Sequence, residues 1–260
     1  MDTILFILIP IFVIVVYFIL RGNTSKSKNM VKLTEEERDL LLKRVHFYQQ
    51  LNDENKLKFE DKLAAFLGYV RIEGVGITIE SLDRVLVASS AIIPVFGFED
   101  WRYKNLTSVL LYPDTFNKDF QFEGGERSIL GMVGEGYMNG QMILSRSALL
   151  IGFSNAVDKE NTAIHEFVHL LDKSDGATDG VPDNLMKHEY TRPWVKMIHQ
   201  EMQHIKKGKS DINPYAITNE AEFFAVVSEY FFEKPQQLKD KHPELYHILS
   251  ETFLQDPAKK

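Results

Sequence analysis

The pentapeptide His165-Glu166-Phe167-Val168-His169 constrains this chain more than any other feature, because its spacing is that of one helical turn. Residues four apart lie on the same face of an α-helix, so the two imidazoles can reach one ion. Glu166 is displaced from His165 by about 100° around such a helix. Its carboxylate would then lie beside the ion without ligating it, where it can accept a proton from a water that the ion activates. The pattern therefore predicts a metal-dependent hydrolase.

The composition narrows the metal and the reaction. The sequence has no cysteine, which excludes disulfides, thiolate metal sites and a cysteine nucleophile. A transition metal must therefore be held by His, Asp or Glu, and paired imidazoles suit zinc, so we expect one Zn²⁺ per chain. The net charge of -7 has the wrong sign for wrapping nucleic acid, and we expect no such partner. No Gly-x-Ser-x-Gly elbow supports a serine hydrolase.

A catalytic zinc needs a third protein ligand and one open position. Asp175 lies ten residues after His165, where metzincin-type sites place their third ligand, but that arrangement needs a glycine where this chain has Asp172. The other candidate is Glu222, in a strongly apolar later segment where a carboxylate is costly unless it is paired or binds a cation. Glu229, seven residues later, would share its helix face. We expect Glu222 to be the ligand and Glu229 its supporting partner.

The N-terminus carries a second strong signal. Residues 4–20 are apolar without a break and would form a helix of ~25 Å, slightly shorter than the hydrocarbon core of a bilayer. No basic residue precedes the run and no small-residue cleavage site follows it, which favours an uncleaved anchor over a signal peptide. The basic residues follow the run, so the positive-inside rule predicts a cytoplasmic domain. We expect a single-pass membrane protein with a transmembrane anchor over 1–21, a linker over 22–33 and a catalytic domain over 34–257.

The rest of the chain is typical of a mixed α/β (α+β) domain with a small sheet and many helices. Thr34 followed by Glu37 predicts a capping box at a helix start. Strands are expected over 106–111 and in 141–153, on either side of a glycine-rich loop or hairpin over 124–140. We hypothesise that the 141–153 segment offers a sheet edge to an extended peptide. Further helices are expected over 54–67, 81–92, 161–172, 186–206, 219–233 and 241–254.

These motifs resemble those of the Mlc titration factor A (MtfA) family of zinc peptidases. The resemblance implies a zincin-like core with extra helices. It also implies that His165, His169 and Glu222 bind zinc. Glu166 would then be the general base and Tyr215 a catalytic phenol. The matching segments are 165–169, Leu171-Asp172, Asp175-Gly176, Tyr215-Ala216, 221–226 and 228–235, with weaker similarity over about 35–255.

The leading interpretation is a zinc metallopeptidase that hydrolyses a peptide or protein substrate. Attack on a peptide carbonyl builds negative charge on its oxygen, which zinc and a donor such as the Tyr215 hydroxyl can stabilise. The alternative is a regulatory binding module whose zinc is structural or vestigial. That alternative follows from the family name, which reflects sequestration of a transcriptional repressor, and it would make a transcriptional regulator a partner.

Overall fold

The described part of the chain forms a sheet of four short strands in the order β1-β2-β4-β3. The computed structural model describes residues 32–123, 126–134, 136–154 and 160–259. β1 (Arg71–Gly74), β2 (Ser108–Tyr112) and β4 (Gln141–Ser145) are parallel neighbours. β3 (Gly131–Val133) runs antiparallel to β4 and forms one edge of the sheet. The mixed α/β class is therefore confirmed.

The 141–153 segment differs from its prediction in two ways. Only its first five residues are strand, and they lie between β2 and β3, so that β4 has no free edge. The following residues form helix α6 (Arg146–Ser154), because the Ser145 hydroxyl accepts the amide of Ala148 and starts a helical turn. The hypothesis of a free edge on this segment is wrong, because the edge strands of the sheet are β1 and β3.

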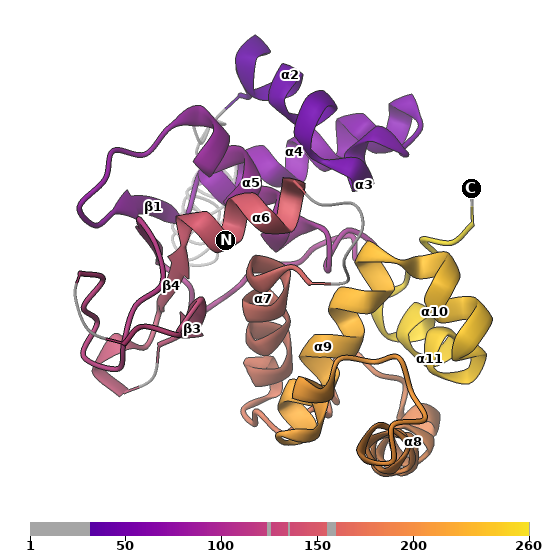
Figure 1. Cartoon of the computed structure of the whole chain (residues 1–260). Coiled ribbons are helices and arrows are strands. Elements are labelled where there is room, and N and C mark those ends of the chain that lie inside the picture. The colour runs from indigo at the N-terminus through magenta and orange to yellow at the C-terminus, as the bar shows by residue number, and fades with distance from the viewer. Residues whose placement is uncertain (1–31, 124–125, 135, 155–159, 260) are drawn as a thin grey trace, which may run out of the picture. The chain divides into compact units, whose positions relative to one another are not determined.

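Four of the described helices come before β2 in the chain and pack against one another (Figure 1). They are α2 (Glu35–Arg44), α3 (His46–Gln49), α4 (Asp53–Leu67) and α5 (Ser81–Ile92). The predicted capping box at the start of α2 is confirmed. The Thr34 hydroxyl accepts the Glu37 amide at 3.1 Å, and the Glu37 carboxylate accepts the Thr34 amide at 2.9 Å.

Two central helices, α7 (Thr162–Asp172) and α9 (Glu220–Glu233), pack against each other, and α7 also packs against β3 (Figure 1). Between them in sequence lie the short helix η2 (Lys173–Asp175), α8 (His188–Lys206) and η3 (Pro214–Ile217). The core is strongly aromatic at these contacts, since Phe167 of α7 meets Phe66 and Tyr103 edge-on or tilted. The packing of α7 between a strand and α9 is what positions the site described below.

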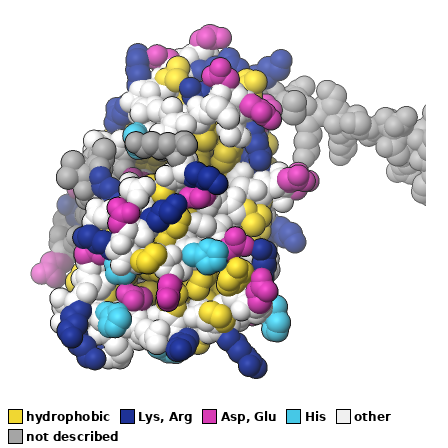
Figure 2. Space-filling model, turned by 90° about the vertical axis from the view of Figure 1, so that its right-hand side faces the viewer, with side chains coloured by type: hydrophobic (Ala, Val, Ile, Leu, Met, Phe, Trp, Pro, Cys, Tyr) yellow, Lys and Arg dark blue, Asp and Glu magenta, His cyan; other side chains and the backbone are white. Residues whose placement is uncertain are grey.

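The last two helices are α10 (Pro235–Lys241) and α11 (Pro243–Phe253), where the sequence predicted one helix over 241–254. Each begins with a proline, which the first turn of a helix tolerates. Phe253 of α11 stacks on Phe224 of α9 and ties this end of the chain to the core. Figure 2 shows one face of the molecule, on which acidic and basic side chains are interspersed rather than gathered by sign.

The membrane placement predicted from the N-terminus is corrected by the structure. The part of the chain that the structure describes holds no helix of the length and apolar character needed to cross a bilayer. Its longest helix, α8, has 19 residues but carries charged side chains along its length. The single-pass prediction rested on residues 4–20. That run, the whole predicted anchor over 1–21 and most of the linker over 22–33 lie outside the described residues.

Candidate metal centre

Helix α7 presents two imidazoles on its partly exposed face. The helix begins at Asn161, whose side chain accepts the amide of Ile164. Its opposite face is buried in the core, which fixes the rotation of the helix about its axis. His165 and His169 then lie one turn apart, with ring centroids separated by 4.7 Å and with their Nε2 atoms 3.1 Å apart. The Nε2 atoms of both imidazoles therefore lie close enough to bind one ion.

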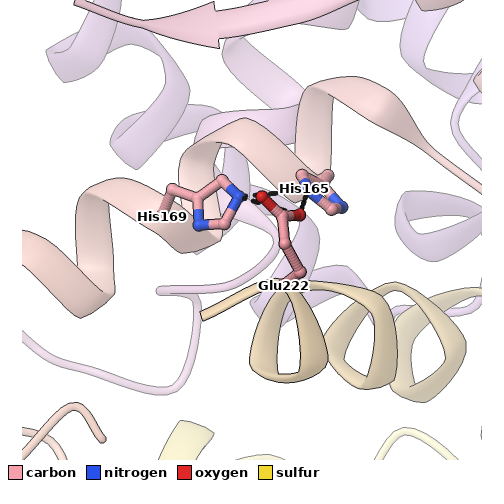
Figure 3. Close-up of side chains that lie close together, drawn as sticks. All are labelled: His165, His169 and Glu222. Atoms are coloured by element: carbon pink, nitrogen blue, oxygen red, sulfur yellow. Dashed lines mark hydrogen bonds and ion pairs between the residues drawn. The ribbon is translucent and has the colours of Figure 1, made fainter. Parts of the chain in front are cut away.

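Helix α9 supplies the carboxylate. Asn219 caps this helix by accepting the amide of Glu222 at 2.8 Å, so Glu222 lies in the first turn. Its Oε2 lies 2.9 Å from Nε2 of His165 and 3.5 Å from Nε2 of His169. Figure 3 shows the Glu222 side chain reaching from α9 toward the two rings on α7.

These three side chains fit a metal ion. One ligand atom from each lies within 4.8 Å of the others, in a grouping unique among the described residues. In a tetrahedral site with bonds of about 2.0–2.1 Å, ligand atoms lie roughly 3.3 Å apart. The separations of 2.9, 3.1 and 3.5 Å bracket that value. The donor set of two imidazoles and one carboxylate matches that of zinc hydrolases.

Glu229 supports the His165 imidazole at the ring nitrogen that does not face Glu222. Its Oε1 lies 2.7 Å from Nδ1 of His165, and its Oε2 accepts the Asn161 amide at 2.6 Å. Because an ionised carboxylate can only accept, Nδ1 of His165 must carry the hydrogen. In the neutral ring the lone pair is then on Nε2, which faces Glu222 and His169. This carboxylate–imidazole pairing is the usual support of a metal-binding histidine.

The electrostatics of the cluster favour a cation. Burial alone would lower the pKa of His165, but hydrogen bonds to Glu222 and Glu229 raise it to about 10. Burial opposes ionisation of Glu222, yet its hydrogen bonds to His165 and His169 lower its pKa to about 2. The carboxylates thus hold a proton on His165 near neutral pH. A metal ion placed between the same atoms would displace that proton. The ion would then supply the positive charge that balances the carboxylates.

Glu166 lies against β3. Its side chain is 7% exposed, and burial raises the pKa of its carboxyl group. A methyl group on Gly131 would lie only 2.6 Å from Cγ of Glu166, so the strand approaches this carboxylate closely. The glycine is needed because any larger residue would occupy the space of the glutamate.

Tyr215 lies at the rim of the same cluster. It belongs to η3, its ring centroid is 6.1 Å from that of His165, and 54% of the residue is exposed. The side chain of Asn213 accepts the Tyr215 amide and donates to the carboxylate of Glu160 at 2.7 Å. The loop that carries the phenol is therefore tied to the segment that precedes α7.

Comparison with known proteins identifies the relatives of this arrangement. Residues 21–254 match the model of the family described as glucose-regulated metallo-peptidase M90. The chain belongs to this family. A protein of Synechocystis sp., slr2042, is 32% identical over 225 residues, which is 82% of each chain. Mlc titration factor A of Pectobacterium atrosepticum is 29% identical over 175 residues, covering 64% of this chain and 65% of the relative.

A second protein of that name, from Klebsiella pneumoniae subsp. pneumoniae, is 26% identical over 224 residues, or 80% of this chain and 82% of the relative. The expected membership of the Mlc titration factor A family is confirmed. This M90 family member is accordingly a metallopeptidase, which implies a metal ion and a peptide substrate.

A set of contacts around Gly180, which the sequence did not reveal, connects the end of α7 to the start of α9. We call these contacts the bracket. Asp172, the last residue of α7, is fully buried and accepts the Gly180 amide at 2.8 Å. Nε1 of Trp194 donates to the Gly180 carbonyl at 2.7 Å. Gly180 has φ +77°, and a methyl group there would lie 2.2 Å from the carbonyl oxygen of Glu220, two residues before Glu222. This bracket sets how closely the start of α9 approaches the end of α7.

The structure also separates the two candidates for the third ligand. Asp175 accepts the amides of Ala177 and Asp183 and shapes its own loop, and it is not in the cluster with the two histidines. Glu222 is in that cluster. Sequence reasoning also missed Gly131, because it is one of six glycines in the segment 124–140, for which the sequence predicts a loop or hairpin, and its close approach to Glu166 becomes visible only once β3 is placed.

Proposed function

We propose that this metallopeptidase is a zinc-dependent, zincin-like enzyme in which His165, His169 and Glu222 bind the ion and Glu166 is the general base. One observation supports this most directly: three ligand atoms from α7 and α9 converge at spacings suited to a tetrahedral ion. The sheet beside α7 supports the proposed zincin-like core.

When bound, zinc would lower the pKa of a coordinated water and polarise the substrate carbonyl. Glu166 would accept the proton of the attacking water and pass it to the leaving amine. Its burial against β3 suits this task, because burial raises the pKa of the carboxyl group and so makes the carboxylate a stronger base. Glu229 would hold His165 in the tautomer that binds the ion.

Tyr215 would donate its hydroxyl to the oxygen on which negative charge develops. Burial raises the pKa of the phenol, with the Glu222 carboxylate adding to the shift, so the hydroxyl keeps its proton and remains a donor. The substrate would pair with the free edge of β3, because Gly131 of this strand lies directly against Glu166.

Replacing Glu166 by Gln tests the assigned base. The variant keeps the shape of the side chain but cannot accept the proton, so we expect it to bind one zinc per chain, unfold at the unchanged temperature and lose about 10²–10⁴-fold in peptide cleavage. Glu244→Gln, on the exposed start of α11, is the matched control and should cleave normally. Normal cleavage by Glu166→Gln would refute the assignment.

A regulatory binding module remains the second candidate, because several relatives carry the name Mlc titration factor A. In that case the partner would be a transcriptional regulator and the zinc would be structural. Binding of such a partner should then survive Glu166→Gln unchanged, and no peptide should be cleaved by the zinc-loaded chain.

A further inference from the structure

A cavity of about 510 Å³ lies beside the proposed site, and none of the roles given above uses it. One wall is the C-terminal end of α7 and η2, where Leu170 directly follows His169. Val133 at the end of β3 and the following Gly134 also line the cavity. The stretch from Asp100 to Leu106 supplies much of the remaining lining. Its size is within the range of small-ligand pockets.

The cavity lies along the course of the proposed substrate. Gly131 at the start of β3 lies against Glu166, and Gly134, the residue after β3 ends, lines the cavity. Three residues of extended chain span about 10 Å, and alternate side chains of a strand share a face. A peptide paired with β3 would therefore place a side chain in the cavity two or three residues from the cleaved bond.

The lining of the cavity is cationic although the chain as a whole carries a net charge of -7. Arg102, Lys104 and Lys173 line it, against one acidic side chain, Asp100, among the described lining residues. Lys104 is exposed, whereas the Arg102 guanidinium lies 4.3 Å from the Tyr69 ring centroid. The Asp100 carboxylate interacts with Lys62. Burial lowers the pKa of Lys62, and the charge of Asp100 opposes that shift.

Neutral side chains complete the lining. Asn105 and Asn139 contribute amides, whereas the Asn184 amide donates to the Ser174 hydroxyl at 2.7 Å. Trp101 lines the cavity too, and its Nε1 is closed off from solvent and has no hydrogen-bond partner among the described residues. Lysines and amides can donate to a carboxylate, and hydrogen bonds in which one partner is charged are about twice as strong as neutral ones.

We propose that this cavity selects substrates with an acidic side chain, Asp or Glu, two or three residues from the cleaved bond. The inference rests on the proposed peptidase site, since it is the course of the peptide along β3 that brings the side chain there. Lys104 is assigned as the residue that determines this specificity.

The test compares peptides that differ only in Glu, Gln or Lys at each of the three positions on either side of one cleavable bond. The zinc-loaded full chain should cleave the best Glu peptide about tenfold more efficiently than its Gln counterpart, mainly through KM. Lys104→Glu should abolish the preference, because two cations then face two carboxylates in the lining. Lys196→Glu, an exposed charge reversal on α8, should leave it unchanged. Equal cleavage of all peptides by the wild type, or the same preference in both variants, would overturn the proposal.

Binding is measured separately, so that a failure of the peptidase site can be distinguished. The chain has two tryptophans, and Trp194 is fully buried, so a fluorescence change on adding the Glu peptide to Glu166→Gln reports on Trp101. We expect a saturable signal that is weakened about tenfold in Lys104→Gln, and its disappearance in Trp101→Phe identifies Trp101 as the reporter. If the wild type cleaves nothing while this binding is seen, the peptidase assignment fails and the cavity assignment stands. Absence of binding overturns the cavity assignment.

Discussion

Replacing Gly180 by alanine tests whether the bracket at the end of α7 positions Glu222. Alanine at φ +77° has a left-handed conformation that costs about 1–2 kcal/mol. The new methyl group would also lie 2.2 Å from the Glu220 carbonyl oxygen, where an ordinary contact begins at 3.4 Å. The start of α9 must therefore move away by roughly 1 Å, which exceeds the tolerance of about 0.2 Å on a metal–ligand bond.

The expected result is a loss of zinc affinity of about ten- to a hundredfold, the usual effect of disturbing the groups that orient metal ligands. Gly208→Ala is the matched control, because Gly208 has φ +64° but no atom within 4 Å of the added methyl group. It should lose the same stability from backbone strain and bind zinc normally. Affinities are measured by competition with a chromophoric chelator, and unfolding temperatures by calorimetry on the metal-free chains. Equal zinc affinity in the two variants would refute the reasoning.

Three further variants follow from the site and its surroundings. Gly131→Ala would push its methyl group against Glu166, so zinc content should stay at one per chain while cleavage falls at least tenfold; unchanged cleavage would contradict the close contact. Glu229→Gln removes the charge behind the first imidazole and should weaken zinc binding by ten- to a hundredfold in chelator competition, with normal affinity as the contrary result. The Glu201 and Asp211 carboxylates raise the pKa of His242 against the effect of burial. The stabilisation from this charge is therefore complete below the unfolded pKa of about 6.5 and is lost as the pH rises through the folded value. His242→Gln should therefore lower the unfolding temperature more at pH 6 than at pH 9, and an equal loss at both values would disprove this.

Much of the site could be predicted because its signals are local. The spacing of His165 and His169 is a property of one helix turn, and α7 and α9 begin and end within about two residues of their predictions. Glu222 was preferred over Asp175 because a carboxylate in an apolar helix needs a partner, and the structure places Glu222 beside both rings.

The features that could not be predicted depend on contacts between distant parts of the chain. The bracket needs Gly180 to meet Glu220, forty residues away, and nothing near Gly180 in the sequence indicates that contact. The position of β4 inside the sheet depends on its pairing with β2 and β3 rather than on its own residues. The apolar run at the N-terminus is, by contrast, a strong local signal. The described helices do not support the membrane prediction that was drawn from it.

The most direct measurement is anomalous diffraction at the zinc absorption edge from crystals of the zinc-loaded chain. The account predicts one strong peak per chain, within about 2.0–2.2 Å of Nε2 of His165, Nε2 of His169 and a carboxylate oxygen of Glu222. A peak bound by other residues, or by the two histidines with Glu222 turned away, would contradict it.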